Sequence, residues 1–297
     1  MQQNNLIGSM TALITPFKNS KIDENCYEKL IKRQINQGIN VIVPVGTTGE
    51  STTLSHEEHK KCIQIAVDVC KNSNTQVIAG AGSNCTAEAI NLASFAQKIG
   101  CDGILSVTPY YNKPSQEGLY QHYKAIASSI DIPVLLYNVP SRTGVDLEAN
   151  TTIRLFDDIK NIYGIKEATG SLQRCVELLS KRKDLKVLCG DDAIDFPMLS
   201  NGANGIISVT ANLLPNLKSK LVKNVFENNL KEARDINNEL YELNDILFIQ
   251  SNPIMIKAAM YLCGLIDNLE YRLPLIAPCK NTLEKLEKVL DKYEVIK

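Results

Sequence analysis

Short runs of apolar and β-branched residues recur along the chain, at intervals of roughly 20 to 35 residues. Each run is followed by turn-forming residues and then by a helical pattern. The runs are continuously apolar instead of alternating, which is typical of strands buried on both faces of a parallel sheet. Eight such strand–helix units predict an α/β fold, a (β/α)8 TIM barrel. The runs are MTALIT, NVIVPV, TQVIAG, GILSV, PVLLY, IYGIK, KVLCG and GIISV.

The predicted helices have recognisable ends. Ser55 and Glu58 have the spacing of a capping box, and Gly100 and Asn201-Gly202 stand where helices should end. From about Lys218 onward the pattern is helical only, and it predicts three helices within 218–248, 253–264 and 281–295. We therefore expect a barrel catalytic domain at 1–225 and a C-terminal three-helix appendage in the helical region 226–297. No linker separates the two, so the appendage should pack against the barrel.

A doubly wound open sheet shares the alternation of strands and helices and is the alternative fold. Its dinucleotide-binding fingerprint is missing, because the stretch GAGSNC has Cys85 where the last glycine of G-x-G-x-x-G is needed. The P-loop pattern is also absent. The sequence therefore favours the barrel and gives no sign of a bound nucleotide.

Composition narrows the class of partner. The chain has 297 residues, of which 44% are hydrophobic and 22% charged, and its formal net charge is −1. This balance offers no basic field for nucleic acid or for a membrane surface, so small molecules are the expected partners. Nine scattered cysteines without a C-x-x-C pair indicate reduced thiols, and no secretory signal is visible at the N-terminus. We therefore expect a cytoplasmic location.

In a parallel barrel the reacting groups lie at the C-terminal ends of the strands and in the loops that follow. Lys166 ends the sixth apolar run. Burial disfavours the ammonium form of a lysine and so can supply a nucleophilic amine. The alternative is a structural Lys166 paired with Glu167 or with another carboxylate. Over the whole sequence, the candidate residues at or just after the predicted strand ends are Thr47, Thr48, Tyr110, Tyr111, Tyr137, Arg142 and Lys166.

The residues expected near Lys166 favour a catalytic lysine over a structural one. An imine-forming lysine needs a proton relay, which hydroxyl groups of Tyr137, Thr48 and Tyr111 can supply, although each tyrosine taken alone is better explained as a half-buried packing residue. The turn GTTGES can hold a carboxylate or cap a helix. Arg142 can bind a second carboxylate or make a surface ion pair.

We expect no metal site. His56 and His59 share a helix face, but they do not meet the H-E-x-x-H spacing and lack a third ligand. There is also no G-x-S-x-G elbow for serine chemistry.

Seven stretches together closely resemble the dihydrodipicolinate synthase (4-hydroxy-tetrahydrodipicolinate synthase) family, in order across almost the whole chain. The resemblance implies a class I aldolase-type barrel, usually a homotetramer (dimer of dimers). It implies condensation of pyruvate with L-aspartate 4-semialdehyde to 4-hydroxy-tetrahydrodipicolinate, in the diaminopimelate route of lysine biosynthesis. No cofactor is implied, because the imine itself is the electron sink. The stretches are GTTGES, VTPYYNKPSQEGLYQHY, YNVPSRTG, GIKEATG, GDD, GIISVTAN and RLPL.

The same resemblance implies roles for single residues. Lys166 matches the Schiff-base lysine. The proton relay matches Tyr137, Thr48 and Tyr111, and Tyr111 is expected to reach into the neighbouring subunit's site. The turn with Thr47 and Thr48 should hold the carboxylate of pyruvate. The remaining substrate-binding positions are Arg142, for the carboxylate of the semialdehyde, and Gly190 and Ile207, whose backbone should line the pocket.

An inhibitory site for L-lysine at a subunit interface is also implied, with Glu88 suited to the ammonium group. Thr52 departs slightly from the family, since some inhibited members carry alanine there. We therefore expect feedback inhibition by L-lysine. The matching residues are Ser51, Thr52, His56, His59, Asn84, Glu88 and Tyr110.

Two rival functions remain. Another Schiff-base pyruvate aldolase or lyase, such as N-acetylneuraminate lyase or a 2-keto-3-deoxy sugar acid aldolase, would also keep Lys166 and Tyr137. Arg142 favours the condensation, because a polyhydroxyl chain calls for neutral partners. A non-catalytic keto-acid-binding barrel is a remote alternative. It would be favoured by loss of the lysine or the relay, and neither is lost.

Overall fold

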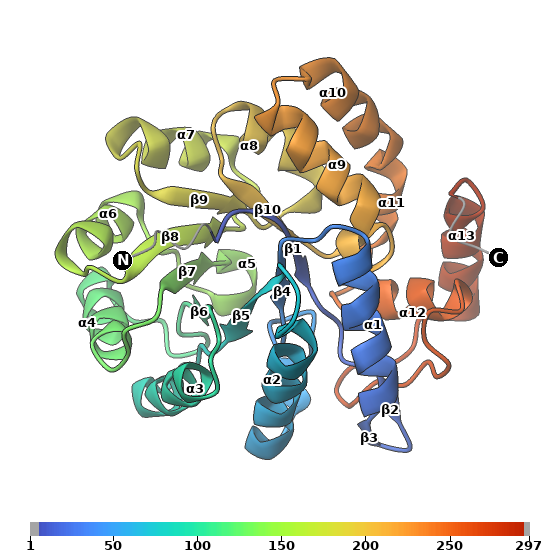
Figure 1. Cartoon of the computed structure of the whole chain (residues 1–297), viewed down its shortest axis with the longest axis horizontal. Helices are drawn as coiled ribbons and strands as arrows, with labels where there is room; N and C mark the ends of the chain where they lie inside the picture. The colour runs from blue at the N-terminus through green and yellow to red at the C-terminus, as the bar shows by residue number, and fades with distance from the viewer. Residues whose placement is uncertain (1–5, 294–297) are drawn as a thin grey trace.

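A computed structural model describes residues 6–293, and eight parallel strands form a closed barrel at its centre (Figure 1). Each of the eight apolar runs overlaps one barrel strand, so the predicted (β/α)8 barrel is confirmed and the open sheet is wrong. In order around the barrel the strands are β1 (Gly8–Ala12), β10 (Gly205–Ser208), β9 (Lys186–Cys189), β8 (Ile162–Glu167), β7 (Val134–Asn138), β6 (Gly103–Val107), β5 (Gln76–Gly80) and β4 (Val41–Val43), and β4 pairs with β1 to close it.

The interior of the barrel is a packed core of side chains from the strands, not an open channel. The opposite faces of the strands pack against the surrounding helices and form a second, larger core. Both faces are therefore buried, which explains why the strands read as continuous apolar runs. The interior includes Met10, Val41, Ile78, Leu105, Leu135, Tyr137, Leu188 and Ile207.

Helices surround the barrel (Figure 1). The capping box is confirmed, because Ser55 Oγ accepts from the Glu58 backbone N–H while the Glu58 side chain accepts from the Ser55 backbone N–H. The helices up to β10 are α1 (Glu24–Asn36), α2 (His56–Cys70), α3 (Thr86–Lys98), α4 (Gln116–Ala127), α5 (Pro140–Thr143), α6 (Ala149–Asp158), α7 (Leu172–Lys181) and α8 (Asp195–Ser200). Short 3-10 turns follow three strands, at η1 (Ser51–Thr53), η2 (Asp192–Ile194) and η3 (Thr210–Asn212).

The helical C-terminal region is confirmed, but the prediction of one helix over 218–248 is wrong. The backbone of Asn228 has φ +63°, which cannot continue a right-handed helix. The apolar spacing runs on through this break, so periodicity alone does not reveal it. The segment forms α9 (Pro215–Phe226), α10 (Leu230–Glu239) and α11 (Tyr241–Ile246). Two more helices follow, α12 (Ile254–Leu262) and α13 (Lys280–Leu290), and positions 294 and 295 of the last predicted helix lie outside the described residues.

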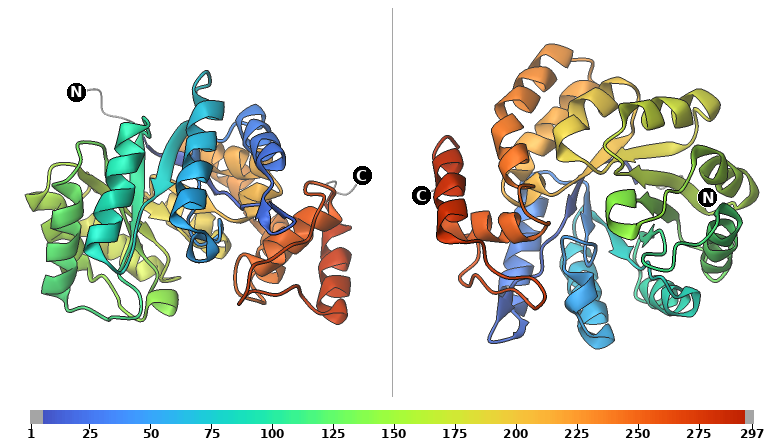
Figure 2. Two further views of the ribbon diagram at one scale, coloured as in Figure 1. Left: turned by 90° about the horizontal axis from the view of Figure 1, so that it is seen from below. Right: turned by 180° about the vertical axis from the view of Figure 1, so that it is seen from behind.

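The last two helices dock beside α1 and the hairpin of β2 (Phe17–Lys18) and β3 (Lys21–Ile22), as Figures 1 and 2 show. Arg272, between α12 and α13, donates to the Glu58 carboxylate and to the backbone oxygen of Ser20. The pair between Lys257 of α12 and Glu50 lies on the same side of the barrel, and both side chains are fully buried. The appendage therefore packs against the barrel, as the missing linker predicts.

Two further features bear on the class of protein. None of the helices within residues 6–293 is both long and apolar enough to cross a membrane. The nine cysteines are free thiols, of which Cys85 and Cys279 are exposed.

Candidate active site

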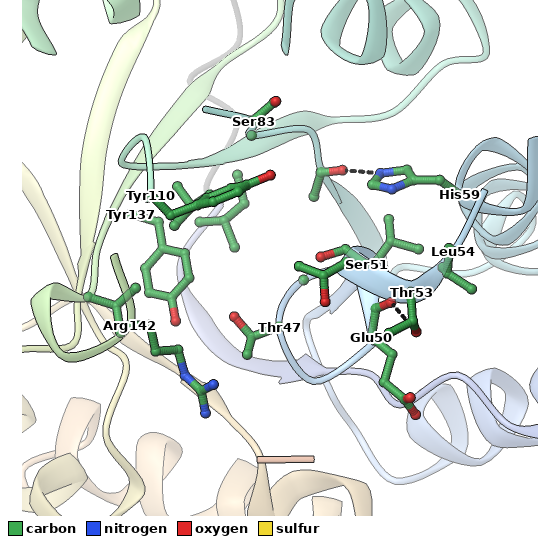
Figure 3. A pocket seen from close by; sticks show the side chains of 18 of the residues that line it. Thr47, Glu50, Ser51, Thr53, Leu54, His59, Ser83, Tyr110, Tyr137 and Arg142 are labelled. Carbon is green, nitrogen blue, oxygen red and sulfur yellow. Dashed lines mark hydrogen bonds between the residues drawn. The ribbon is translucent and has the colours of Figure 1, made fainter. Parts of the chain in front are cut away.

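A cavity of about 560 Å³ opens at the C-terminal ends of the barrel strands (Figure 3). Its lining residues come mainly from the ends of β4, β5, β6 and β7 and the loops after them, with others from α2, α3 and the segments before α12 and α13. The sequence-predicted residues among them include Thr47, Tyr110, Tyr137 and Arg142. The cavity therefore lies where a parallel barrel collects its reacting groups.

Lys166 adjoins this cavity through Tyr137. Its side chain is 6% exposed, and the register of β7 and β8 sets Lys166 directly beside Tyr137. The Lys166 Nζ atom lies 4.3 Å from the centre of the Tyr137 ring. Gly190, after β9, leaves the space that the lysine needs, since a Cβ there would come within 2.8 Å of Lys166 Cε. The predicted lysine and tyrosine are thus brought together by the barrel.

The structural alternative for Lys166 is not supported. Glu167 faces other partners, because its carboxylate accepts from the Thr169 backbone N–H at 2.8 Å and from Asn138 Nδ2 at 3.3 Å. Burial raises the pKa of Glu167. None of the ion pairs found between residues 6 and 293 involves Lys166. Lys166 is thus buried without a carboxylate partner in the described part of the chain, which a purely structural ion pair does not explain.

The turn after β4 is compact and held by its own backbone. The Gly49 and Ser51 N–H groups both donate to the Gly46 oxygen, at 3.1 and 3.3 Å. A Cβ at Gly49 would lie 2.9 Å from the Val45 backbone, so only glycine fits there. Thr48 is 2% exposed, and its Oγ1 accepts from Asn252 Nδ2 at 2.9 Å. The turn therefore presents Thr47 to the cavity while Thr48 is fixed beneath it.

Arg142, on α5, lies at the mouth of the cavity. Its Nη2 donates to the backbone oxygen of Asn252 at 3.3 Å, and none of the ion pairs in the described part of the chain occupies its guanidinium. Figure 3 shows the guanidinium, the Tyr137 hydroxyl and the Thr47 side chain facing the same space. A free guanidinium at this point can bind a carboxylate with two parallel hydrogen bonds.

The structure does not bring Tyr111 to Lys166. The Tyr111 side chain is 90% exposed, and its backbone has φ +75°. Tyr110, the preceding residue, lies on the cavity wall instead. Ile207 is 1% exposed within the barrel interior. Within one chain the predicted relay therefore lacks its third hydroxyl group.

The residues predicted to bind the inhibitor L-lysine lie at the far end of the same cavity. His56 Nε2 lies 2.6 Å from Glu88 Oε1, and Ser83 also donates to the Glu88 carboxylate. The His59 ring makes a hydrogen bond to the Gly80 oxygen at 2.7 Å, and burial lowers the pKa of His59. Asn84 Nδ2 donates to the Tyr110 oxygen at 3.2 Å. Ser51 and Thr52 complete the lining on this side.

Sequence reasoning missed the contribution of the segment around α12. Asn252 contacts both Thr48 and Arg142, and Lys257 Nζ lies 2.5 Å from Glu50 Oε1, with both side chains 0% exposed. Burial lowers the pKa of Lys257 in spite of this carboxylate. A signal was present, because SNPIMIKAAM places a turn-forming Asn-Pro pair before a helix and one lysine among apolar residues. A lone lysine in such a pattern needs a buried partner.

Metal ligation finds no support in the part of the chain that the structure describes. Residues 6–293 contain no group of three or more His, Cys, Asp or Glu side chains that could hold a metal ion.

Known proteins resemble this chain over almost its whole length. Residues 5–293 match the family described as the Dihydrodipicolinate synthetase family. The 4-hydroxy-tetrahydrodipicolinate synthase of Aliarcobacter butzleri (strain RM4018) is 68% identical over 292 residues, which cover 98% of this chain and 99% of that relative.

Two solved structures are informative. The chloride-inhibited dihydrodipicolinate synthase from Acinetobacter baumannii, complexed with pyruvate, matches with a TM-score of 0.95 and 44% identity, over 98% of this chain and 99% of that one. The synthase from Cyanidioschyzon merolae with lysine bound matches with a TM-score of 0.93 and 35% identity, over 97% and 98% of the two chains.

Proposed function

The chain belongs to the dihydrodipicolinate synthetase family and is a lyase with 4-hydroxy-tetrahydrodipicolinate synthase activity, and we propose that it works through a Schiff base on Lys166. Its reaction belongs to the diaminopimelate route of lysine biosynthesis. The observation that carries the proposal is a buried lysine that has no carboxylate partner within residues 6–293 and lies against the Tyr137 ring at the cavity. The high identity to synthases favours this function over N-acetylneuraminate lyase.

In the proposed course, the Lys166 amine attacks the ketone carbon of pyruvate and forms a carbinolamine. Tyr137, with Thr48 beneath the cavity, passes a proton to the departing hydroxyl group, so that water leaves and an imine remains. Loss of a methyl proton gives the enamine. Its methylene carbon attacks the aldehyde carbon of L-aspartate 4-semialdehyde, whose oxygen takes up a proton. The amine of this adduct then attacks the imine carbon, displaces Lys166 and closes the ring.

The carboxylates of the two substrates have separate proposed partners. The turn with Thr47 and Thr48 receives the carboxylate of pyruvate, supported by Thr47, which lines the cavity and faces the same space as the Tyr137 hydroxyl. Arg142 receives the carboxylate of the semialdehyde, supported by its unpaired guanidinium at the cavity mouth. Gly190 and Ile207 are proposed to line the base of the site through their backbone.

The proposed assembly is a homotetramer, a dimer of dimers. Support comes from Tyr111, a large side chain that is 90% exposed at the cavity's edge and absent from its own site. In the dimer, Tyr111 of one chain completes the proton relay of its neighbour. Free thiols support a proposed cytoplasmic location. The closed barrel supports the proposed division into a catalytic barrel at 1–225 and a helical region at 226–297.

L-lysine is proposed to inhibit the enzyme from the far end of the cavity. The support is the cluster in which His56, Ser83 and Glu88 meet near the ring of His59. The Glu88 carboxylate suits the ammonium group of an amino acid. The match to a synthase with lysine bound adds to this support.

The deciding experiment for the Schiff base is chemical trapping. The protein is incubated with pyruvate and borohydride, and the modified residue is located by mass spectrometry. We expect one reduced pyruvate adduct, on Lys166, and none in Lys166→Ala. Lys257→Arg serves as a second lysine variant that should still be labelled on Lys166. An adduct on another lysine, or no adduct at all, would refute the mechanism. Ring formation on addition of the semialdehyde then tests the second substrate.

A further inference from the structure

The Asn138 side chain closes the base of the loop that carries Arg142. Asn138 ends β7, and the chain then runs through α5, which contains Arg142, to Leu147. Asn138 Oδ1 accepts from the Leu147 backbone N–H at 3.0 Å. Its Nδ2 donates to Asp146 Oδ1 at 2.7 Å. One side chain therefore joins the two ends of the loop that presents Arg142 to the cavity.

The neighbours of this amide determine which of its ends is the oxygen. A backbone N–H can only donate, so the atom that faces the Leu147 nitrogen is Oδ1. The other end faces the carboxylate of Asp146 and, at 3.3 Å, that of Glu167. Asn138 is 0% exposed, so water cannot replace these contacts. The position needs one acceptor and one donor on the same short side chain, which aspartate and leucine cannot both supply.

The far end of the loop is held by α7. Arg174 Nη2 donates to Asp146 Oδ2 at 2.7 Å, and Nη1 donates to Asp146 Oδ1 at 3.2 Å. Arg174 Nη1 also donates to the backbone oxygen of Leu147 at 3.0 Å. A two-point pair of this kind fixes orientation as well as distance. Asn138 thus connects β7 to a loop end that is already fixed.

The same side chain lies behind the proposed catalytic pair. The register of β7 and β8 sets Tyr137 beside Lys166 and Asn138 beside Glu167. Side chains alternate along a strand, so Tyr137 and Lys166 face the barrel interior while Asn138 and Glu167 face the surrounding helices. The contact between Asn138 and Glu167 therefore relates the base of the Arg142 loop to the strand end that carries the lysine.

We propose that Asn138 is a positioning residue for the second substrate. It holds the loop so that the Arg142 guanidinium meets the carboxylate of the aldehyde while the aldehyde carbon lies beside the enamine on Lys166. Asn138 is buried, so it acts through Arg142 and not on the substrate itself. The inference rests on the proposed function, in which Arg142 binds this carboxylate. The pyruvate half of the reaction depends less on the loop, because β8 is held by its ladders with β7 and β9.

The test is a double-mutant cycle on kcat/KM for L-aspartate 4-semialdehyde. Asn138→Leu keeps the approximate shape of the side chain and removes its hydrogen bonds. We expect kcat/KM for the semialdehyde to fall about 10- to 100-fold, as for a binding group displaced by about 1 Å. The kcat/KM for pyruvate should stay within about threefold of wild type. In an Arg142→Ala background, Asn138→Leu should cost less than about threefold, because coupled residues are not additive.

Asn161→Leu is the matched control. Asn161 immediately precedes β8, and its Nδ2 donates to the backbone oxygens of Ala127, Ile130 and Ile132. It holds a loop as Asn138 does, but at the N-terminal end of the strands, away from the cavity. Asn161→Leu should lower the melting temperature without changing the ratio of the two kcat/KM values. A purely structural Asn138 would behave in the same way.

Equal costs of Asn138→Leu in the wild-type and Arg142→Ala backgrounds would overturn the proposal, and so would a parallel fall in both kcat/KM values. If Asn138→Leu does not fold, Asp146→Ala replaces it in the cycle, since it removes the same loop contact at a side chain that is 39% exposed. An Arg142→Ala enzyme with unchanged kcat/KM for the semialdehyde would refute the role of Arg142 and with it that of Asn138. Failure of borohydride trapping in wild type would refute the Schiff base alone.

Discussion

Gly190 determines where the Lys166 side chain can lie. A Cβ at this position would stand 2.8 Å from Lys166 Cε and 2.8 Å from the Cβ of Ala168. Atoms cannot remain at these separations, so the lysine or the strand has to move. Gly190, at the end of β9, must therefore lack a side chain if Lys166 of β8 is to keep its position.

Gly190→Ala should lower kcat about 100-fold, because a displacement of the reacting group by about 1 Å costs that much. Steady-state rates and the rate of borohydride labelling measure it, and both should fall together. Gly118→Ala, on α4 and away from the cavity, is the control, with its nearest atom 3.2 Å from the added Cβ. A Gly190→Ala enzyme with the wild-type rate would show that a Cβ at position 190 does not displace Lys166.

At the scale of elements, the starts of α2 and α3 meet at the far end of the cavity. His56 begins α2, and Glu88 lies in the first turn of α3. Their side chains approach to 2.6 Å, so a ligand bound there would contact both helices. The same cavity extends to Tyr137, so residues near Lys166 and residues at the far end line one continuous space.

Glu88→Gln should weaken inhibition by L-lysine about 10-fold or more, because a hydrogen bond between two charged groups becomes one to a neutral amide. The inhibition constant for lysine is measured at fixed pyruvate and semialdehyde. Glu117→Gln, which removes an exposed carboxylate paired with Arg154, is the matched control. Wild-type turnover that is unchanged by saturating lysine would remove the basis of the inhibitory site.

On the scale of the whole molecule, the proposed proton relay is incomplete within one chain. Tyr137 and Thr48 belong to it, whereas Tyr111 points out of it. An exposed tyrosine beside a cavity is unusual for a residue with a proposed catalytic role. The arrangement makes sense when a second chain covers it, so activity and assembly should be linked.

Complementation between two defective chains tests this link. A Tyr111→Phe chain keeps Lys166, and a Lys166→Ala chain keeps Tyr111, so a mixed dimer contains one complete site. Co-refolding at equal amounts should restore about a quarter of all sites if chains pair at random. Tyr241→Phe, an exposed tyrosine outside the cavity, should be fully active by itself and controls for the loss of a hydroxyl group. No recovery in the mixture would mean that Tyr111 does not act across the interface.

The sequence predicts the features that depend on local pattern. The barrel, the capping box of α2 and the neighbourhood of Lys166 and Tyr137 all follow from apolar runs and from what ends them. The helix break at Asn228 is not predicted, because the apolar spacing continues through it. The hairpin β2–β3 escapes because each strand has two residues. The contact between Asn252 and Thr48 is not predicted, because the two residues are 204 positions apart and no local pattern indicates such a contact.

That distance has a consequence for how the enzyme is made. A ribosome delivers the chain from its N-terminus, so the strands of the barrel and the turn after β4 emerge long before α12. Until α12 arrives, Thr48 lacks its amide donor and Glu50 lacks Lys257. A nascent barrel thus contains Lys166 before the turn proposed to hold the pyruvate carboxylate has all of its contacts. Competence for the proposed reaction therefore depends on α12 as well as on the barrel strands, although the two are synthesised far apart in time.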